Sequence, residues 1–195
     1  MAPSTKLALA NSLRRLLQKK FLDDITVKEI VEDCEVNRQT FYYHFQDIYD
    51  LLHWFLEHET AEVLQPCTSW QEALMTSFHY IQENHVIIYH IYRSSGREHL
   101  DCQFFTMSHA LTAKLLDTAA EGLVLAERDR EFLIDFYMYA LAGTMLGWLA
   151  DDMKEDPSEL AARISFLLED EFRRVAQRFS SSPQHPDLSI YVSPR

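Results

Sequence analysis

The stretch NRQTFYYHF, residues 37–45, places a row of hydrogen-bonding side chains on one short segment. Seven of its first eight residues, all except Phe41, carry a polar group. Phe41 and Phe45 are four residues apart, which predicts a helix with both rings on its inner face. Asn37 suits the N-cap of this helix because its side-chain oxygen can accept a backbone N–H. The polar side chains are then left on the outer face.

A second short helix is predicted just before this segment. Thr26 suits its N-cap, and Glu29, three residues later, completes a capping box. The apolar residues that follow end near Cys34, and a tight turn is expected at residues 35–36. Two short helices joined by a tight turn predict a helix-turn-helix. In that motif the second helix enters the major groove of DNA with its N-terminus first.

The outer face of residues 37–45 carries side chains that match DNA. Arginine suits a guanine edge and glutamine an adenine edge, each through two hydrogen bonds. Hydroxyl groups, imidazoles and the N–H groups of helix N-termini suit phosphates. The predicted DNA contacts are Thr26, Lys28, Asn37, Arg38, Gln39, Thr40, Tyr42, Tyr43 and His44. The alternative is a helical hairpin whose aromatic residues all lie in the core, but residues 41–45 hold too many rings for one inner face.

The charge is divided unevenly along the chain. Residues 1–46 hold seven Lys or Arg and six Asp or Glu, a net charge of +1, whereas the whole chain carries −12. The remaining residues therefore carry −13. Only the N-terminal part is suited to contact with a polyanion such as DNA.

The composition favours an all-α fold in three parts. Hydrophobic residues make up 47% of the 195 residues, and there are only 4 Gly and 6 Pro. We expect a helix-turn-helix domain at 1–46, a helical domain at 47–179 and a flexible tail at 180–195. The expected helices after Pro66 are 69–84, 85–94, 97–121, 127–152 and 157–179.

Several classes of protein are disfavoured. No run of eighteen apolar residues occurs, so we expect no membrane span. The three cysteines are widely spaced and form neither a disulfide framework nor a metal-binding pair, which fits the reducing cytoplasm. Nine histidines give no convincing metal site, and no catalytic or nucleotide-binding motif is present. We expect neither an enzyme nor a cofactor.

The segment ITVKEIVEDCEVNRQTFYYHFQDIYDLL, residues 25–52, resembles the DNA-binding signature of the tetracycline-repressor (TetR/AcrR) family. The pattern T-x-Y-x-H-F at residues 40–45 is its most specific part. The resemblance implies a homodimer that binds a partly palindromic operator in two major grooves. It also implies a larger C-terminal helical domain that dimerises through a four-helix bundle and responds to an effector.

The sequence departs from the family pattern at two positions. Glu35 stands where the turn usually carries a glycine, and this site often needs φ > 0, which costs a non-glycine residue roughly 1 kcal/mol. Ile48 stands where a lysine commonly begins the fourth helix, which removes one phosphate contact per subunit. The segment from Arg38 to Leu52, followed by Trp54 and Phe55, also resembles the branch that regulates dihydroxyacetone kinase genes, which implies activation through a partner protein.

Two sets of residues in the C-terminal domain are candidates for an effector pocket and a dimer interface. Apolar pockets with a few polar anchors are typical of ligand sites, and the candidates are Phe78, His79, Tyr89, Arg93, Phe104, Phe105, His109, Phe136, Tyr137 and Trp148. Small residues on one helix and an apolar stripe on the next favour a four-helix dimer interface. These are Ala140, Gly143, Gly147, Leu160, Ile164, Leu167, Leu168 and Phe172. An ordinary intramolecular core is the alternative for both sets.

The sequence thus predicts a homodimeric cytoplasmic transcription regulator that binds an operator and responds to a small apolar effector or a partner protein. A helical protein-interaction module, or co-regulator, with little DNA affinity of its own is the alternative, because Glu35, Ile48 and the acidic C-terminal domain all weaken attraction to DNA.

Overall fold

The computed structural model describes residues 5–168 and 170–181. Every regular element in these residues is helical, which confirms the predicted all-α fold. In chain order the elements are α1 (Thr5–Leu17), the 3-10 helix η1 (Leu22–Asp24), α2 (Val27–Asp33), α3 (Arg38–His44), α4 (Ile48–Leu64), α5 (Trp70–Glu83), α6 (His85–Tyr92), α7 (Arg97–Ala119), α8 (Glu127–Ala150), α9 (Pro157–Leu168) and α10 (Glu171–Ser181).

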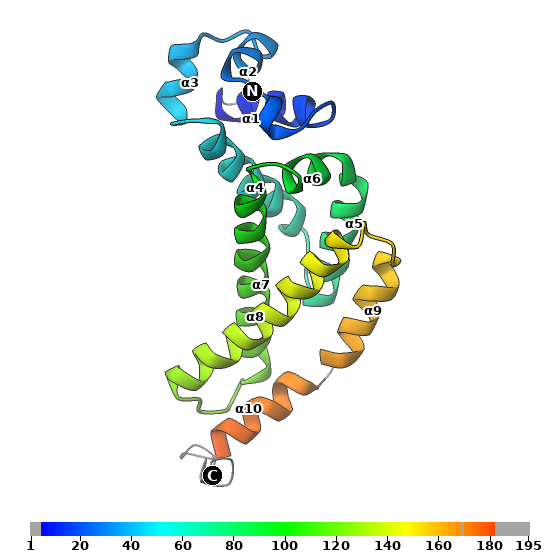
Figure 1. Ribbon diagram of the computed structural model, residues 1–195. Coiled ribbons are helices and arrows are strands. Elements are labelled where there is room, and N and C mark those ends of the chain that lie inside the picture. Colours follow the sequence, from blue (N-terminus) through cyan, green and yellow to red (C-terminus); the bar gives the residue numbers. More distant parts are fainter. Residues whose placement is uncertain (1–4, 169, 182–195) are drawn as a thin grey trace, which may run out of the picture.

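Helices α1 to α3 form a small unit at one end of the molecule, here called the head (Figure 1). Leu9, Leu13 and Leu17 follow one face of α1 and are fully buried. Within this core the Ser12 hydroxyl donates to the carbonyl of Ile30 at 3.0 Å, which ties α1 to α2. The amphipathic spacing of α1 thus decides which side of the head is closed by the other two helices.

Helix α4 leads from the head into the remaining helices, α5 to α10, here called the body (Figure 1). Its Asp47 N-cap accepts the backbone N–H groups of Tyr49 and Asp50. Helices α7 and α8 form a long hairpin, which is the most extensive helix pair in the molecule. Helix α5 packs against α4 and α9, so the body core lies between the α7–α8 pair and α5.

The helix predicted at 157–179 is two helices, so that prediction is wrong. The chain turns between α9 and α10, where Asp170 adopts a left-handed backbone with φ 60°. The break lets α9 pack on α5 while α10 packs on α7. The predicted tail at 180–195 begins two residues too early, because α10 continues to Ser181, and residues 182–195 lie outside the described residues.

Helix α8 has the length and apolar composition of a membrane span, although the sequence predicts none. Among the described residues it is the one helix long and apolar enough to cross a membrane by length and composition. It packs along α7, and 44% of its apolar 18-residue stretch is buried inside the molecule. The core helix of a water-soluble protein has the same character, because one face is buried and aromatic residues extend onto the other.

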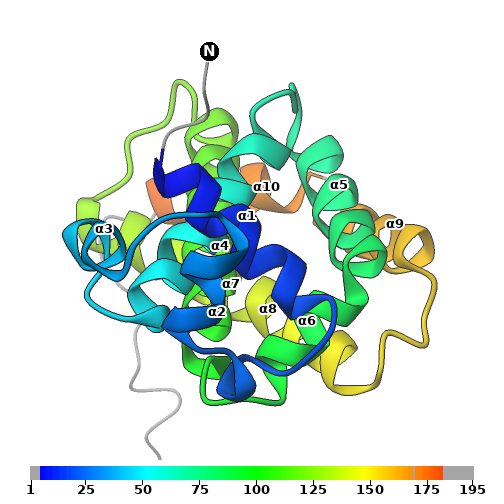
Figure 2. The same ribbon diagram turned by 90° about the horizontal axis from the view of Figure 1, so that it is seen from above.

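The head rests on the body at the α6–α7 corner. Seen from above in Figure 2, α1 crosses α4 and α6, and it contacts both helices. The carbonyl oxygen of Leu17 lies 2.6 Å from His90 Nδ1. The carboxylate of Asp23 accepts the backbone N–H of Ser95 at 3.1 Å. These polar contacts join segments more than seventy residues apart and fix the position of the head.

Gly96 completes this junction because a side chain has no room there. A Cβ atom at Gly96 would overlap methyl groups of Leu22 in the head and Leu52 in α4. Both leucines are almost completely buried. The head and α4 therefore pack directly against the backbone of the corner, which is a close approach that only glycine permits.

Candidate nucleic-acid interface

Helix α2 begins with the predicted capping box. Thr26 Oγ1 accepts the backbone N–H of Glu29 at 3.3 Å, and Glu29 Oε2 accepts the backbone N–H of Thr26 at 3.0 Å. Lys20 donates to Glu29 Oε1 at 2.6 Å. Hydrogen bonds from Lys20 and then from Thr26 lower the pKa of Glu29 from 4.5 to about 2. The start of the helix-turn-helix is thus fixed by a charged network.

The turn after α2 uses a left-handed residue, as the usual glycine of the family would imply. Glu35 has φ 55°. The backbone N–H of Val36 donates back to the carbonyl of Val31 at 2.9 Å, the bond of a Schellman motif. This turn directs the chain from α2 into α3, and Glu35 carries the cost of the left-handed conformation.

Helix α3 divides its residues cleanly between core and solvent. Phe41 and Phe45 are 0% and 3% exposed, whereas Tyr42 and Tyr43 are 59% and 84% exposed. Asn37 caps the helix by accepting the backbone N–H of Thr40 at 2.7 Å. Of the nine predicted DNA contacts, only Thr40 and His44 are half-buried, and the other seven are exposed. The outer face predicted for α3 is therefore exposed to solvent.

The members of this surface differ in how far they are already engaged. The hydroxyls of Thr26 and Thr40 donate within the head, to Glu29 at 2.8 Å and to Asn37 at 3.0 Å. Lys28 lies 3.7 Å from Glu32 in an exposed pair. Each threonine still presents lone pairs but has used its proton locally. The strongest donors left for DNA are Arg38, Gln39 and the two exposed tyrosines.

The N-terminus of α4, where phosphates often bind in proteins, is already satisfied by carboxylates. Asp47 accepts two backbone N–H groups there, and Asp50 Oδ2 accepts the N–H of Gln46 at 2.9 Å. Ile48, which replaces the usual lysine, is half-buried against the core. This end of α4 therefore offers little attraction to a polyanion, so α2 and α3 would have to supply most of the contacts to DNA.

The residues predicted for dimerisation fall into two groups. Ala140, Gly143 and Gly147 are exposed on α8, and Leu167 is 71% exposed on α9. Leu160, Ile164, Leu168 and Phe172 are at most 8% exposed inside the single chain. The buried group serves the intramolecular core, which the sequence left open as the alternative.

The structure adds aromatic residues to the exposed group. Phe132, Phe136 and Tyr139 share the exposed face of α8 and are 57%, 58% and 63% exposed. Exposed apolar patches of this kind are typical of interaction sites. Phe136 was predicted to line a pocket, and Phe132 and Tyr139 belonged to no predicted site, although the spacing of the three residues on one helix face can be seen in the sequence.

The residues predicted for an effector pocket do not gather around one cavity. Phe78 and Trp148 are buried and pack edge to face, with ring centroids 5.1 Å apart. Tyr89 and Phe136 lie on the surface. The others have separate surroundings: His79 contacts Ser158, Arg93 lies over Tyr89 and Tyr92, Phe105 packs on Tyr139, Tyr137 packs on Phe172, and His109 is exposed.

A cavity of about 50 Å³ lies elsewhere, between α4, α5, α6 and α7. Phe104 is the one predicted pocket residue that lines it. Its wall is mostly apolar, with polar groups from Glu59, Tyr80 and Gln103 among the few exceptions. A neighbouring surface groove of about 380 Å³ runs along α4, α5 and α7. These polar residues were not predicted, because the predicted pocket followed clusters of aromatic residues and included no residue of α4.

The capped α2, the left-handed turn and the exposed face of α3 define a helix-turn-helix DNA-binding protein. Residues 11–53 match the model of the bacterial regulatory proteins of the tetR family. Residues 68–170 match a TetR-type transcriptional regulator C-terminal region. The chain therefore belongs to the TetR family of transcriptional regulators.

Two relatives are similar to this chain in sequence or fold. The HTH-type dhaKLM operon transcriptional activator DhaS of Lactococcus lactis subsp. lactis (strain IL1403) is 30% identical over 91 residues. That match spans 45% of this chain and 49% of the relative, about half of each. A solved structure of a dihydroxyacetone kinase operon activator DhaS has a TM-score of 0.69 at 20% identity, covering 91% of this chain and 98% of that one.

A more distant structure shares the same architecture. The fatty acid degradation regulator FadR from Bacillus halodurans has a TM-score of 0.55 at 14% identity. The superposition covers 95% of this chain and all of that one. At these identities the solved structures support the fold: an N-terminal helix-turn-helix followed by a larger helical domain.

Proposed function

We propose that this regulator binds a partly palindromic operator as a homodimer, with α3 of each subunit in a major groove. The observation that carries the proposal is the outer face of α3, where Tyr43 is 84% exposed while Phe41 behind it is fully buried. Arg38 and Gln39 at the start of the helix are exposed and suited to base edges. The two half-sites are expected about 34–36 Å apart, one helical turn of DNA.

Fluorescence anisotropy with the DNA upstream of its own gene tests this proposal. Gln39→Ala and Tyr43→Ala should each weaken binding by about 10-fold, because one good base contact contributes about 1–3 kcal/mol. Gln82→Ala, an exposed glutamine on α5, is the matched control and should bind as the unmodified protein does. Unchanged affinity in both α3 variants, with intact dimers, means that α3 is not the reading helix.

The homodimer itself is proposed to form through the exposed face of α8. Phe132, Phe136 and Tyr139 supply apolar area there, and Gly143 and Gly147 allow a second helix to approach closely. Helix α8 of a partner crossing the same face would produce a two-fold interface. Its burial removes the aromatic surface that the single chain leaves in water.

The sign of regulation is proposed to be activation. The relative that is 30% identical over 91 residues is named as a transcriptional activator of an operon. The carboxylates at the start of α4 and the missing lysine at Ile48 favour modest operator affinity, which fits a regulator that acts with an effector or a partner protein. In a reporter assay with its own upstream DNA, deletion of this regulator should lower transcription. A rise would establish repression instead.

The proposed role is regulatory rather than catalytic, and it implies a cytoplasmic location, where the DNA of a bacterium lies. The alternative of an interaction module without DNA affinity predicts equal, weak binding to the upstream DNA and to an unrelated duplex. Preference for the upstream duplex separates the two, and the slope of affinity against salt then counts the phosphate contacts.

A further inference from the structure

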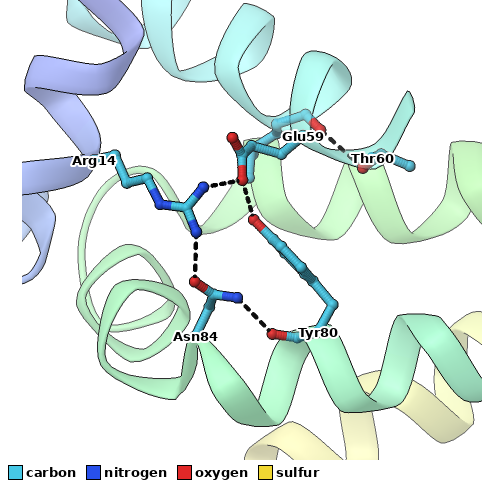
Figure 3. Close-up of polar contacts among 6 residues, drawn as sticks. Arg14, Glu59, Thr60, Tyr80 and Asn84 are labelled. Atoms are coloured by element: carbon cyan, nitrogen blue, oxygen red, sulfur yellow. Dashed lines mark hydrogen bonds and ion pairs between the residues drawn. The ribbon is translucent and has the colours of Figure 1, made fainter. Parts of the chain in front are cut away.

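A polar network connects the head to the wall of the cavity (Figure 3). Arg14 of α1 donates to Glu59 Oε2 of α4 and, through its other terminal nitrogen, to Asn84 Oδ1 at 2.8 Å. The Tyr80 hydroxyl of α5 donates to the same oxygen of Glu59. Asn84 also donates to the carbonyl of Tyr80, at 2.9 Å. One carboxylate therefore holds α1, α4 and α5 together.

Only one of the two carboxylate oxygens of Glu59 accepts hydrogen bonds from the described residues. Both of its hydrogen bonds fall on Oε2, and Oε1 makes none with any residue that the structure describes. The side chain is 17% exposed, and Glu59 lines the cavity together with Tyr80. Burial, followed by the contact with Glu59, raises the pKa of Tyr80, so its hydroxyl stays a donor. Glu59, paired with Arg14 through Oε2, therefore brings to the cavity wall a carboxylate with one oxygen unused.

We propose that this cavity binds an apolar molecule with a protonated amine, whose ammonium group donates to Glu59 Oε1. An ammonium has three donors and no acceptor, so it complements a carboxylate surrounded by apolar side chains. A carboxylate ligand would instead bring two negative charges together, which is unfavourable at low dielectric. The carboxylate of Glu59 thus selects a cationic head group, and the apolar lining of the cavity selects a hydrocarbon body for the ligand.

The hydrocarbon part of the ligand extends from the cavity into the neighbouring groove. A cavity of about 50 Å³ alone holds only a few waters. Leu64 and Met107 line both the cavity and the 380 Å³ groove, as do Thr60 and Gln103. Gln103 Nε2 donates to Thr60 Oγ1 at 2.9 Å across this boundary. Rotation of the flexible Met107 joins the two spaces, which together reach the ~300–1,000 Å³ of common ligand sites.

The proposed amine and Arg14 compete for one negative charge. Each cation reduces the attraction that Glu59 exerts on the other, and this coupling is reciprocal. Amine binding therefore loosens α1 from the body, and removal of Arg14 tightens amine binding. This regulatory consequence rests on the proposed DNA-binding function, whereas the binding of the amine does not.

Isothermal titration of the full chain, without DNA, tests the site with n-hexylamine, 1-hexanol and hexanoate as probes. We expect hexylamine to bind at least about 10-fold more tightly than the other two, as a charge-assisted hydrogen bond contributes ~1.5–3 kcal/mol. Glu59→Gln should abolish this preference, and Arg14→Gln should raise hexylamine affinity several-fold. Glu62→Gln, an exposed carboxylate on the same helix, is the control and should change neither.

Hexanoate binding as tightly as hexylamine, or hexylamine affinity that survives Glu59→Gln, would overturn the proposal. If Glu59→Gln fails to fold, Tyr80→Phe replaces it: loss of one donor to Oε2 should raise amine affinity, and a fall or no change counts against the site. Anisotropy with operator DNA then tests the coupling, which is wrong if saturating hexylamine leaves DNA affinity unchanged. A chain that binds hexylamine as proposed but binds no DNA contradicts only the proposed function.

Discussion

Replacement of Glu35 by glycine should stabilise the protein. Glu35 occupies the left-handed region at φ 55° in the turn that connects α2 to α3. This conformation costs an L-residue ~1–2 kcal/mol, and the greater freedom of glycine in the unfolded chain offsets ~0.4–1 kcal/mol of the gain. The net gain in the free energy of unfolding for Glu35→Gly is then about 1 kcal/mol, or ~2–4 °C in Tm for a chain of this size.

Glu35→Ala separates the backbone effect from the effect of charge. Both variants remove the same negative charge beside α3, so both should bind DNA more tightly, and equally. Only glycine relieves the left-handed conformation. Thermal unfolding should therefore rank Glu35→Gly above Glu35→Ala by about 1 kcal/mol. Equal stability of the two variants, or a lower Tm for the glycine variant, would refute the reasoning that the turn is strained.

Three further changes test other parts of the structure. Lys20 and Thr26 lower the pKa of Glu29 from 4.5 to about 2, so the contribution of Glu29 to protein stability is complete above pH 4.5 and is lost toward pH 2. Glu29→Gln should flatten the dependence of Tm on pH over that interval. Parallel curves of Tm against pH for the variant and the unmodified protein would contradict this. Gly96→Ala should destabilise the protein by about 1–3 kcal/mol in urea unfolding, since its methyl group meets Leu22; an unchanged midpoint would show that the corner has room. Tyr139→Lys should convert dimers to monomers in sedimentation, and persistent dimers would place the interface elsewhere.

The head could be predicted from sequence because its structure depends on local hydrogen bonds. Thr26 and Asn37 are predicted as N-caps, and each accepts the expected backbone N–H group. Phe41 and Phe45 were predicted as core residues and are buried. Caps and four-residue spacing act within one or two turns of helix, so a single segment contains all the information.

The body was less predictable because its features depend on how distant helices meet. The apolar spacing continues through residues 157–179, and no glycine, proline or break in this spacing indicates that the chain turns at Asp170. The cavity is a place that side chains fail to fill, and it depends on four helices at once. Aromatic residues were a poor guide to it, because Phe78 fills the core and Phe136 faces outward.

The exposed aromatic face of α8 links the stability of this protein to its concentration. A dilute chain must keep Phe132, Phe136 and Tyr139 in water, at a cost that disappears when a second copy covers them. In the proposed homodimer, the free energy of unfolding follows mass action and rises with the amount of protein in the cell. If the proposed homodimer forms, a cell that makes little of this regulator holds it mainly as the less stable monomer, and synthesis and turnover then set its working level alongside any effector.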